Sequence, residues 1–267
     1  MSFVTLPPID CHVHSKYSPD SESELEDIAK TALSREIAQV AVVDHLYSPE
    51  HLPRLFSRPA NQKIYGVTLL MGVELSLETN IAIKALETGG AEKWGPVSGA
   101  VHGFAPWKLY PAFNEQGYSE PAFGASCRAA GLTLLLEYYV DVSTRAMRTG
   151  AMDILTHPFD IFIYGSLFSN LFIAAAEELA FTAAFCGVAV ELNEHIMRLI
   201  GNSETADSAK WRGIYQRLAL SVIARGGRLV MGSDAHHARD VGDVRCATMF
   251  VKDLGVPLAS LEEKLKG

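Results

Sequence analysis

The feature that most constrains this chain is a short apolar run, ending in a polar or acidic residue, that recurs along the sequence. Runs of this length bounded by turn residues are typical of strands buried in a parallel sheet. Stretches with helical character lie between them, so strand and helix alternate about seven times. This predicts a parallel sheet with helical crossovers, either a barrel or an open doubly wound sheet. The runs cover residues 9–14, 38–44, 67–74, 97–102, 152–157, 188–193 and 228–234.

The segments between these runs divide into helices and long loops. Ser23 and Glu26 have the spacing of a capping box, which marks the start of a helix. Segments 46–66 and 103–121 read as long loops that form walls of a substrate pocket. The aromatic residues of the second loop are interpreted as anchors of the loop itself, with a lid over the pocket as the alternative. Helices are expected over residues 23–35, 118–148 (one or two), 169–185 and 206–225.

Composition narrows the class of protein. The chain has 267 residues, 48% of them hydrophobic and 20% charged, and we expect a single domain over 1–267. A net charge of −8 argues against a partner that is a long nucleic acid, although nucleotides remain possible. The apolar stretch 167–190 contains two central glutamates, so no membrane segment is expected, and the N-terminus does not have the pattern of a signal peptide. The four cysteines have no C-x-x-C spacing, which favours a cytoplasmic location.

Histidines and carboxylates at the predicted strand ends indicate a metal site. His12 and His14 are two apart on a strand, so both side chains face the same way and can bind one cation. Asp234 and His236 repeat this spacing at the other end of the chain. Glu74 ends an apolar strand, where an unpaired carboxylate would cost several kcal/mol unless a metal, a lysine or exposure to solvent relieved it.

Three more histidines follow the ends of other predicted strands. They are His45, His102 and His157. The strand ends of a barrel converge in space, so these side chains are expected to meet the five residues named above. Imidazole and carboxylate ligands together suit Zn²⁺, Mn²⁺ or Fe²⁺.

Taken together, these residues resemble the PHP (polymerase and histidinol phosphatase) family. The resemblance runs from residue 9 to about 243, in the order of the family's motifs. It implies a distorted (β/α)7 TIM-like barrel with two or three divalent metal ions at the C-terminal ends of the strands. The matching motifs are Asp10-x-His12-x-His14-Ser15 with Ser18 and Asp20, Asp44-His45, Gly72-x-Glu74, His102, Thr156-His157-Pro158, Glu191-x-Asn193 and Ser233-Asp234-Ala235-His236.

The resemblance also implies a role for each matched position. Glu74 is expected to bridge two ions, and with Asp234 and His236 it belongs to the catalytic centre. The identity of the metal stays open among Zn²⁺, Mn²⁺ and Fe²⁺. The implied ligand sets are His12, His14, Glu74 and Asp234 for one ion, Glu74, His102 and His157 for a second, and Asp20, His45 and His236 for a third.

The expected reaction is attack by a metal-activated hydroxide on a small phosphomonoester, with histidinol phosphate as the first candidate. A phosphodiesterase or nuclease acting on nucleotides, and a metal-dependent amidohydrolase, are the alternatives. The residues expected to contact the substrate are Arg198, His237, Asn193, Arg239 and Lys16. His51 and His195 are interpreted as ordinary loop or helix residues. The oligomeric state is not predicted.

Overall fold

The computed structural model describes residues 9–87, 94–111, 121–202 and 206–256. Its centre is a sheet in which seven parallel strands follow the order β1-β2-β4-β5-β6-β7-β8. Each apolar run overlaps one of these strands, as predicted, although β2 and β4 each extend two residues beyond their runs. The strands are β1 (Ile9–Val13), β2 (Gln39–Leu46), β4 (Val67–Ser76), β5 (Val97–Ala100), β6 (Ile154–Leu155), β7 (Ala189–Asn193) and β8 (Arg228–Gly232).

The first and last strands meet, so the sheet is nearly closed into a barrel. The Asp234 N–H donates to the His12 carbonyl at 2.8 Å, and the His14 N–H donates to the Ala235 carbonyl at 2.9 Å. These bonds lie just past the end of β8, where Val13 and Ala235 form a parallel bridge. The predicted (β/α)7 barrel is therefore confirmed.

A buried carboxylate fastens this seam. Asp10 on β1 accepts hydrogen bonds from the Ser233 N–H at 2.9 Å, from the Ser233 hydroxyl at 2.6 Å and from the Gly242 N–H at 2.7 Å. Each bond joins the start of the chain to the segment after the last strand. Asp10 is fully buried, so these N–H and O–H groups supply the hydrogen bonds that water would make to an exposed carboxylate.

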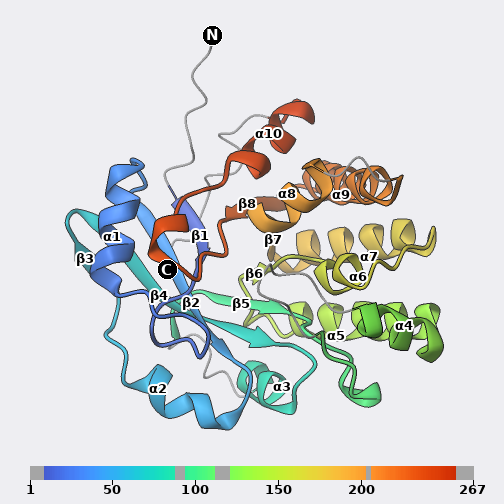
Figure 1. Ribbon diagram of the computed structural model, residues 1–267, viewed down its shortest axis with the longest axis horizontal. Helices are drawn as coiled ribbons and strands as arrows, with labels where there is room; N and C mark the ends of the chain where they lie inside the picture. The colour runs from blue at the N-terminus through green and yellow to red at the C-terminus, as the bar shows by residue number, and fades with distance from the viewer. Residues whose placement is uncertain (1–8, 88–93, 112–120, 203–205, 257–267) are drawn as a thin grey trace.

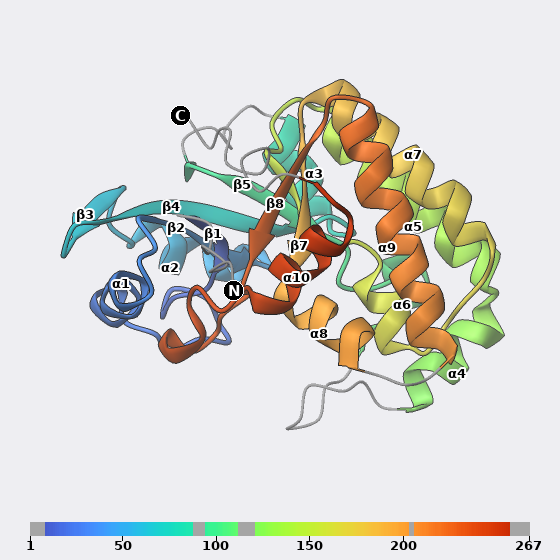
Figure 2. The ribbon, with the colours of Figure 1, turned by 90° about the horizontal axis from the view of Figure 1, so that it is seen from above.

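Helices surround the sheet, and three of the longest form one flank of the molecule. In Figures 1 and 2, α7 lies between α5 and α9, beside the half of the sheet made by β5 to β8. Helix α1 covers the other half, next to β2 and β4. The helices are α1 (Leu25–Ser34), α2 (Leu52–Phe56), α3 (Asn80–Glu87), α4 (Pro121–Ala130), α5 (Leu132–Arg148), α6 (Asp160–Tyr164), α7 (Leu171–Cys186), α8 (Glu194–Asn202), α9 (Ala206–Ala224) and α10 (Arg245–Asp253).

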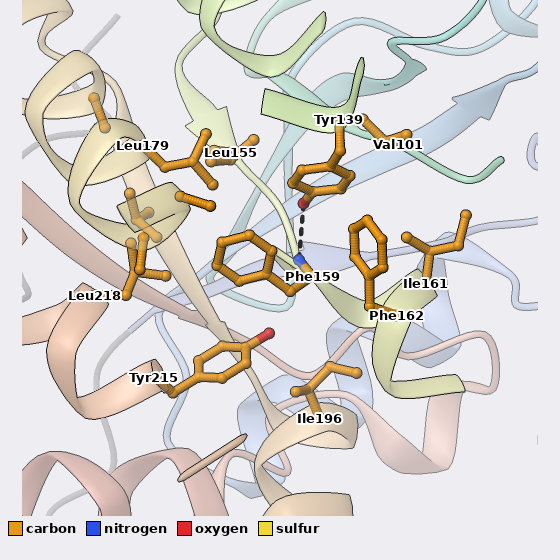
Figure 3. Close-up of a cluster of buried hydrophobic side chains, with 14 of the residues drawn as sticks. Val101, Tyr139, Leu155, Phe159, Ile161, Phe162, Leu179, Ile196, Tyr215 and Leu218 are labelled. Atoms are coloured by element: carbon orange, nitrogen blue, oxygen red, sulfur yellow. Dashed lines mark hydrogen bonds between the residues drawn. The ribbon is translucent and has the colours of Figure 1, made fainter. Parts of the chain in front are cut away.

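An aromatic core supports the loop after β6. Figure 3 shows Tyr139 of α5 and Tyr215 of α9 around Phe159 and Phe162, which follow this strand. The Phe159 N–H donates to the Tyr139 hydroxyl at 2.8 Å. Because Phe159 is two residues from His157, this packing sets the course of the backbone that carries a predicted ligand.

Two local predictions were wrong. Ser23 does not cap α1, which begins at Leu25 without a side-chain cap, because the Ser23 hydroxyl donates instead to the His236 carbonyl at 3.1 Å. Segment 46–66 is not one loop, since it contains a 3-10 turn (Pro49–His51), helix α2 and strand β3 (Gln62–Ile64), which pairs antiparallel with β4.

The other boundaries follow the prediction more closely. The segment 118–148 forms two helices, which are separated at Gly131, where φ is 99°. Segment 103–121 holds a 3-10 turn (Ala105–Trp107), and its residues 112–120 lie outside the described chain. In the part of the chain that the structure describes, no helix combines the length and apolar character needed to cross a membrane.

Candidate metal centre

All nine predicted ligands gather at the C-terminal ends of the strands. Each comes from the last residues of a strand or from the loop that follows it. Four overlapping groups of three or four residues place their ligand atoms within 4.8 Å of one another. Among them, His12, His14 and Glu74 are fully buried. The groups are His14, Asp20, His45 and His236; His12, His157 and Asp234; His12, His14 and Glu74; and His45, Glu74 and His102.

Glu74 stands at the middle of the cluster, and its two oxygens face different histidines. Oε2 lies 3.2 Å from His12 Nε2 and 3.1 Å from His45 Nδ1. Oε1 lies 3.0 Å from His157 Nε2 and 3.7 Å from His102 Nε2. Although burial opposes ionisation, His12 and His45 hold the Glu74 pKa well below its usual value. The side chain is therefore a carboxylate with one oxygen available to each of two cations.

Two further carboxylates extend the cluster toward solvent. Asp234 Oδ1 lies 3.4 Å from His12 Nε2 and 3.2 Å from His14 Nε2. Asp20 Oδ2 lies 3.4 Å from the Nε2 atoms of both His45 and His236. Each of the three ligand sets implied by the sequence is thus assembled in space.

The donor atoms of these residues fit divalent cations. His12 Nε2 and His14 Nε2 are 3.0 Å apart, and the His14 ring lies 4.2 Å, centre to centre, from the rings of His45 and His236. Burial, together with the charge of His236, lowers the His14 pKa to about 4. His14 is therefore neutral near pH 7, which is the form that ligates metals. A cation held by His12 Nε2 and His14 Nε2 would be ligated through the lone pairs of these two nitrogens.

Groups behind the histidines fix the orientation of three rings. For each of these three histidines, a carboxylate or hydroxyl of another residue lies near Nδ1, so that Nε2 points toward the centre of the cluster. Glu191 was matched to a motif in the sequence but given no function. It could have been found by the reasoning applied to Glu74, because it is a fully buried acid on an apolar strand. The pairs are Glu191 Oε1 with His12 Nδ1 at 3.0 Å, Asp160 Oδ2 with His157 Nδ1 at 2.8 Å, and Ser76 Oγ with His102 Nδ1 at 3.0 Å.

Two of the candidate ligands have a strained backbone. Asp234 has a φ of 55° and His157 a φ of 26°, in the region that favours glycine. Hydrogen bonds hold both in place, because the His157 N–H donates to Glu191 Oε2 at 2.7 Å and Asn193 Nδ2 donates to Asp234 Oδ2 at 3.2 Å. Asn193, expected to contact substrate, is thus placed behind Asp234, where it orients that carboxylate.

A cavity of about 660 Å³ opens over the cluster. Three of the expected substrate contacts line it, namely Arg198, His237 and Arg239. Lys16 is absent from its walls, and its ammonium pairs with Glu24 at 2.7 Å. His195, interpreted from the sequence as an ordinary residue, also lines the cavity.

Comparison with known proteins identifies the family. The PHP domain matches residues 10–195, which is more than half of the chain. The chain belongs to the PHP-domain family. Probable phosphatases from Shewanella align with this PHP protein over nearly its whole length. That of Shewanella frigidimarina (strain NCIMB 400) is 23% identical over 257 residues, covering 95% of this chain and 87% of the relative. That of Shewanella piezotolerans is 25% identical over 258 residues, with the same two coverages.

Solved structures share the PHP fold. Histidinol phosphate phosphatase from Lactococcus lactis, solved with zinc, L-histidinol and phosphate, superposes with a TM-score of 0.60 and 15% identity over 93% of this chain and 94% of its own. A chain of an archaeal ribonuclease P complex gives a TM-score of 0.52 at 14% identity, over 94% of this chain and 84% of its own. The PHP family match and the relatives make this chain a metal-dependent hydrolase of the phosphatase type, as the sequence predicted.

Proposed function

We propose that this protein hydrolyses a small phosphomonoester and that L-histidinol phosphate is the first substrate to test. The observation that carries this proposal is the position of Glu74, whose two oxygens each face a pair of histidines beneath a cavity large enough for a small organic phosphate. The proposed ligand sets are those implied by the sequence. When bound there, divalent ions would lower the pKa of a bound water and offset charge on the phosphate.

The side chains of the cavity rim would position the substrate. Arg198 Nη2 lies 3.5 Å from both Glu194 Oε1 and Asp243 Oδ2, so two carboxylates direct the guanidinium while about half of its side chain stays exposed. A planar guanidinium can donate two parallel hydrogen bonds to a phosphate. His237 and Arg239 also line this cavity and add hydrogen-bond donors. Arg198 is thus proposed to bind the phosphate oxygens.

The test begins with the purified, metal-loaded protein. Bound Zn, Mn and Fe are measured per chain. Phosphate release is assayed from histidinol phosphate and p-nitrophenyl phosphate, p-nitrophenol release from the diester bis-p-nitrophenyl phosphate, and p-nitroaniline release from the amide p-nitroacetanilide. We expect two or three ions per chain and faster hydrolysis of the monoesters. Faster hydrolysis of the diester would overturn the monoesterase proposal and favour a phosphodiesterase. Hydrolysis of amides alone would favour an amidohydrolase.

The Asp234→Ala variant tests the site itself. Asp234 faces both His12 and His14, so its loss should lower metal affinity and kcat by about 100-fold or more, since even the outer partners of metal ligands are worth 10- to 100-fold. The matched control is Asp207→Ala, which removes an exposed carboxylate that pairs with Lys210 on the surface of α9. A variant of Asp234 that keeps its metals and its full rate would exclude the proposed site.

A further inference from the structure

A second cavity adjoins the one above the candidate metal centre. Its volume is about 410 Å³, and it shares the side chains of Tyr47, His102, Asp160 and Tyr164 with the larger cavity. His102 is a proposed metal ligand, so the smaller cavity begins beside the cluster. A phosphate held at the cluster therefore has room on this side for the group to which it is esterified. The remaining walls are Ser76, Glu78, Thr79, Tyr110, Pro111 and Ile161.

Glu78 is a buried acid on the wall of this cavity. It is 8% exposed, its carboxyl group accepts a hydrogen bond at 3.2 Å from the His102 N–H, and burial raises its pKa to about 7. Within the described residues, no lysine, arginine or histidine side chain forms an ion pair with it. Its carboxylate is thus a buried acceptor on the cavity wall with unused hydrogen-bonding capacity.

Asp160, the other acid of this cavity, is already engaged. Its Oδ2 lies 2.8 Å from His157 Nδ1, and its Oδ1 accepts the Ile161 N–H at 2.7 Å. It still adds negative charge to the wall. The other polar groups of the cavity are the His102 imidazole, whose pKa is lowered by burial, and the neutral hydroxyls of tyrosine, serine and threonine. The electrostatic character of the cavity is therefore acidic, and the larger cavity differs because it also contains Arg198 and Arg239.

A buried carboxylate without a counter-ion is costly, and a ligand that brings a cation or N–H donors relieves this cost. We propose that the smaller cavity receives the leaving alcohol and that Glu78 selects alcohols carrying a protonated nitrogen, such as an ammonium or imidazolium group. This inference rests on the proposed phosphomonoesterase function. It also gives a function to the start of the loop 103–121, because Tyr110 and Pro111 form the outer wall of this cavity.

The experiment compares substrates that differ in the charge of the alcohol. Steady-state kinetics are measured for the metal-loaded protein and for Glu78→Gln with four phosphomonoesters, named here by the charge of their alcohol. Histidinol phosphate and O-phosphoethanolamine are the cationic substrates, and glycerol 3-phosphate and p-nitrophenyl phosphate are the neutral ones. Gln keeps an oxygen that can accept the His102 N–H and removes only the charge. We expect kcat/KM to fall roughly 10- to 100-fold for the cationic substrates, the range for a lost hydrogen bond to a charged group. For the neutral substrates the change should stay within about threefold.

Controls distinguish the selection of substrates by Glu78 from the phosphatase function on which it rests. Glu137→Gln makes the same chemical change on the exposed face of α5 and should alter none of the four rates. An equal loss with all four substrates, at unchanged metal content, would overturn the selection by Glu78 and leave the phosphatase function standing. No phosphate release from any substrate by the metal-loaded wild type would instead overturn the proposed function.

A measurement on the wild type keeps the inference testable if Glu78→Gln does not fold or bind metal. Free L-histidinol and ethanolamine are compared with glycerol and 1-propanol as inhibitors of p-nitrophenyl phosphate hydrolysis. The amino alcohols should inhibit at concentrations at least about tenfold lower, because only they can pair with the carboxylate. Equal inhibition by charged and neutral alcohols would contradict the proposal.

Discussion

At the scale of single residues, the candidate site depends as much on the groups behind the histidines as on the histidines themselves. Glu191 shows this most clearly, because one oxygen accepts from His12 Nδ1 and the other from the backbone N–H of His157. One buried side chain thus orients two proposed ligands from strands β1 and β6. Losing it would free one imidazole to rotate and relax a strained backbone.

We therefore predict that Glu191→Gln lowers metal affinity by about 10- to 100-fold without unfolding the protein. The amide can still fill the space, but it presents only one acceptor where the carboxylate presents two. Metal titration against a competing chelator measures the effect. Glu178→Gln on the exposed face of α7 is the control. Unchanged affinity in the Glu191 variant would show that His12 is oriented by something else.

At the scale of elements, β8 approaches its neighbours too closely for any side chain at Gly232. A Cβ at this position would overlap the Glu191 carboxylate and the Cβ of His12. The glycine therefore lets the carboxylate of β7 reach the imidazole of β1 beneath the end of β8. The packing of β8 against its neighbours and the orientation of His12 by Glu191 therefore both depend on a glycine at position 232.

Gly232→Ala should lower the free energy of unfolding by about 1–3 kcal/mol, the usual cost of overpacking, and should also weaken metal binding. The control is Gly213→Ala on the exposed face of α9, where a Cβ meets nothing within 4 Å. That change should be neutral or stabilise by up to about 1 kcal/mol, because alanine favours helix. Urea unfolding of both variants, with metal content measured in parallel, checks the contrast. Similar losses in the two would exclude the steric explanation.

The elements that the sequence predicted correctly are those with a periodic or repeated signal. Seven buried strands were located because each has an apolar run and a polar end. Strand β3 was missed because its three residues are too short to show a pattern. The capping box failed because the hydroxyl of Ser23 found a tertiary acceptor on His236, which no local spacing reveals.

The same distinction holds for the site. The nine proposed ligands lie in the last residues of strands or in the loops after them, so their convergence could be predicted from the topology. Lys16 was expected to reach substrate from its place in the loop after β1, but it pairs with Glu24 and lies off the cavity wall. The second cavity and the place of Glu78 in it could not be predicted, since they depend on how the segments at the ends of four strands, β2, β4, β5 and β6, pack together.

For the whole molecule, bound metal should raise the stability of the fold, whereas a rise in pH should lower the stability of the metal-free protein. Burial disfavours protonation of His236, but the carboxylates of Asp20 and Asp234 outweigh it and raise its pKa to about 9. The unfolded value is about 6.5. In metal-free protein the interaction of His236 with Asp20 and Asp234 therefore contributes its full stabilisation below about pH 6.5. This stabilisation is lost as the pH rises toward 9. His12 and His157 are shifted in the same direction by their carboxylate neighbours.

Metal-loaded protein should behave differently, because ligands bind cations in their deprotonated forms. We predict that chelation lowers Tm, by an amount equivalent to about 4 kcal/mol when free metal exceeds Kd by 1,000-fold. Between pH 6.5 and 9, Tm should fall in the chelated protein and should not fall in the loaded one. Thermal unfolding with and without chelator measures both effects, and His236→Asn should flatten the chelated curve. Parallel curves in the two states would contradict the prediction.

The seam at Asp10 determines when the site can exist during synthesis of the chain. The proposed ligands begin at His12 and end at His236, and the strands that carry them are joined by the contacts of Asp10 with Ser233 and Gly242. A nascent chain that has not yet emerged past residue 236 lacks at least one proposed ligand, and one that has not emerged past residue 242 lacks part of the bonds that hold β1 beside the last strand. The complete ligand set can therefore form only after β8 and the segment that follows it have been synthesised.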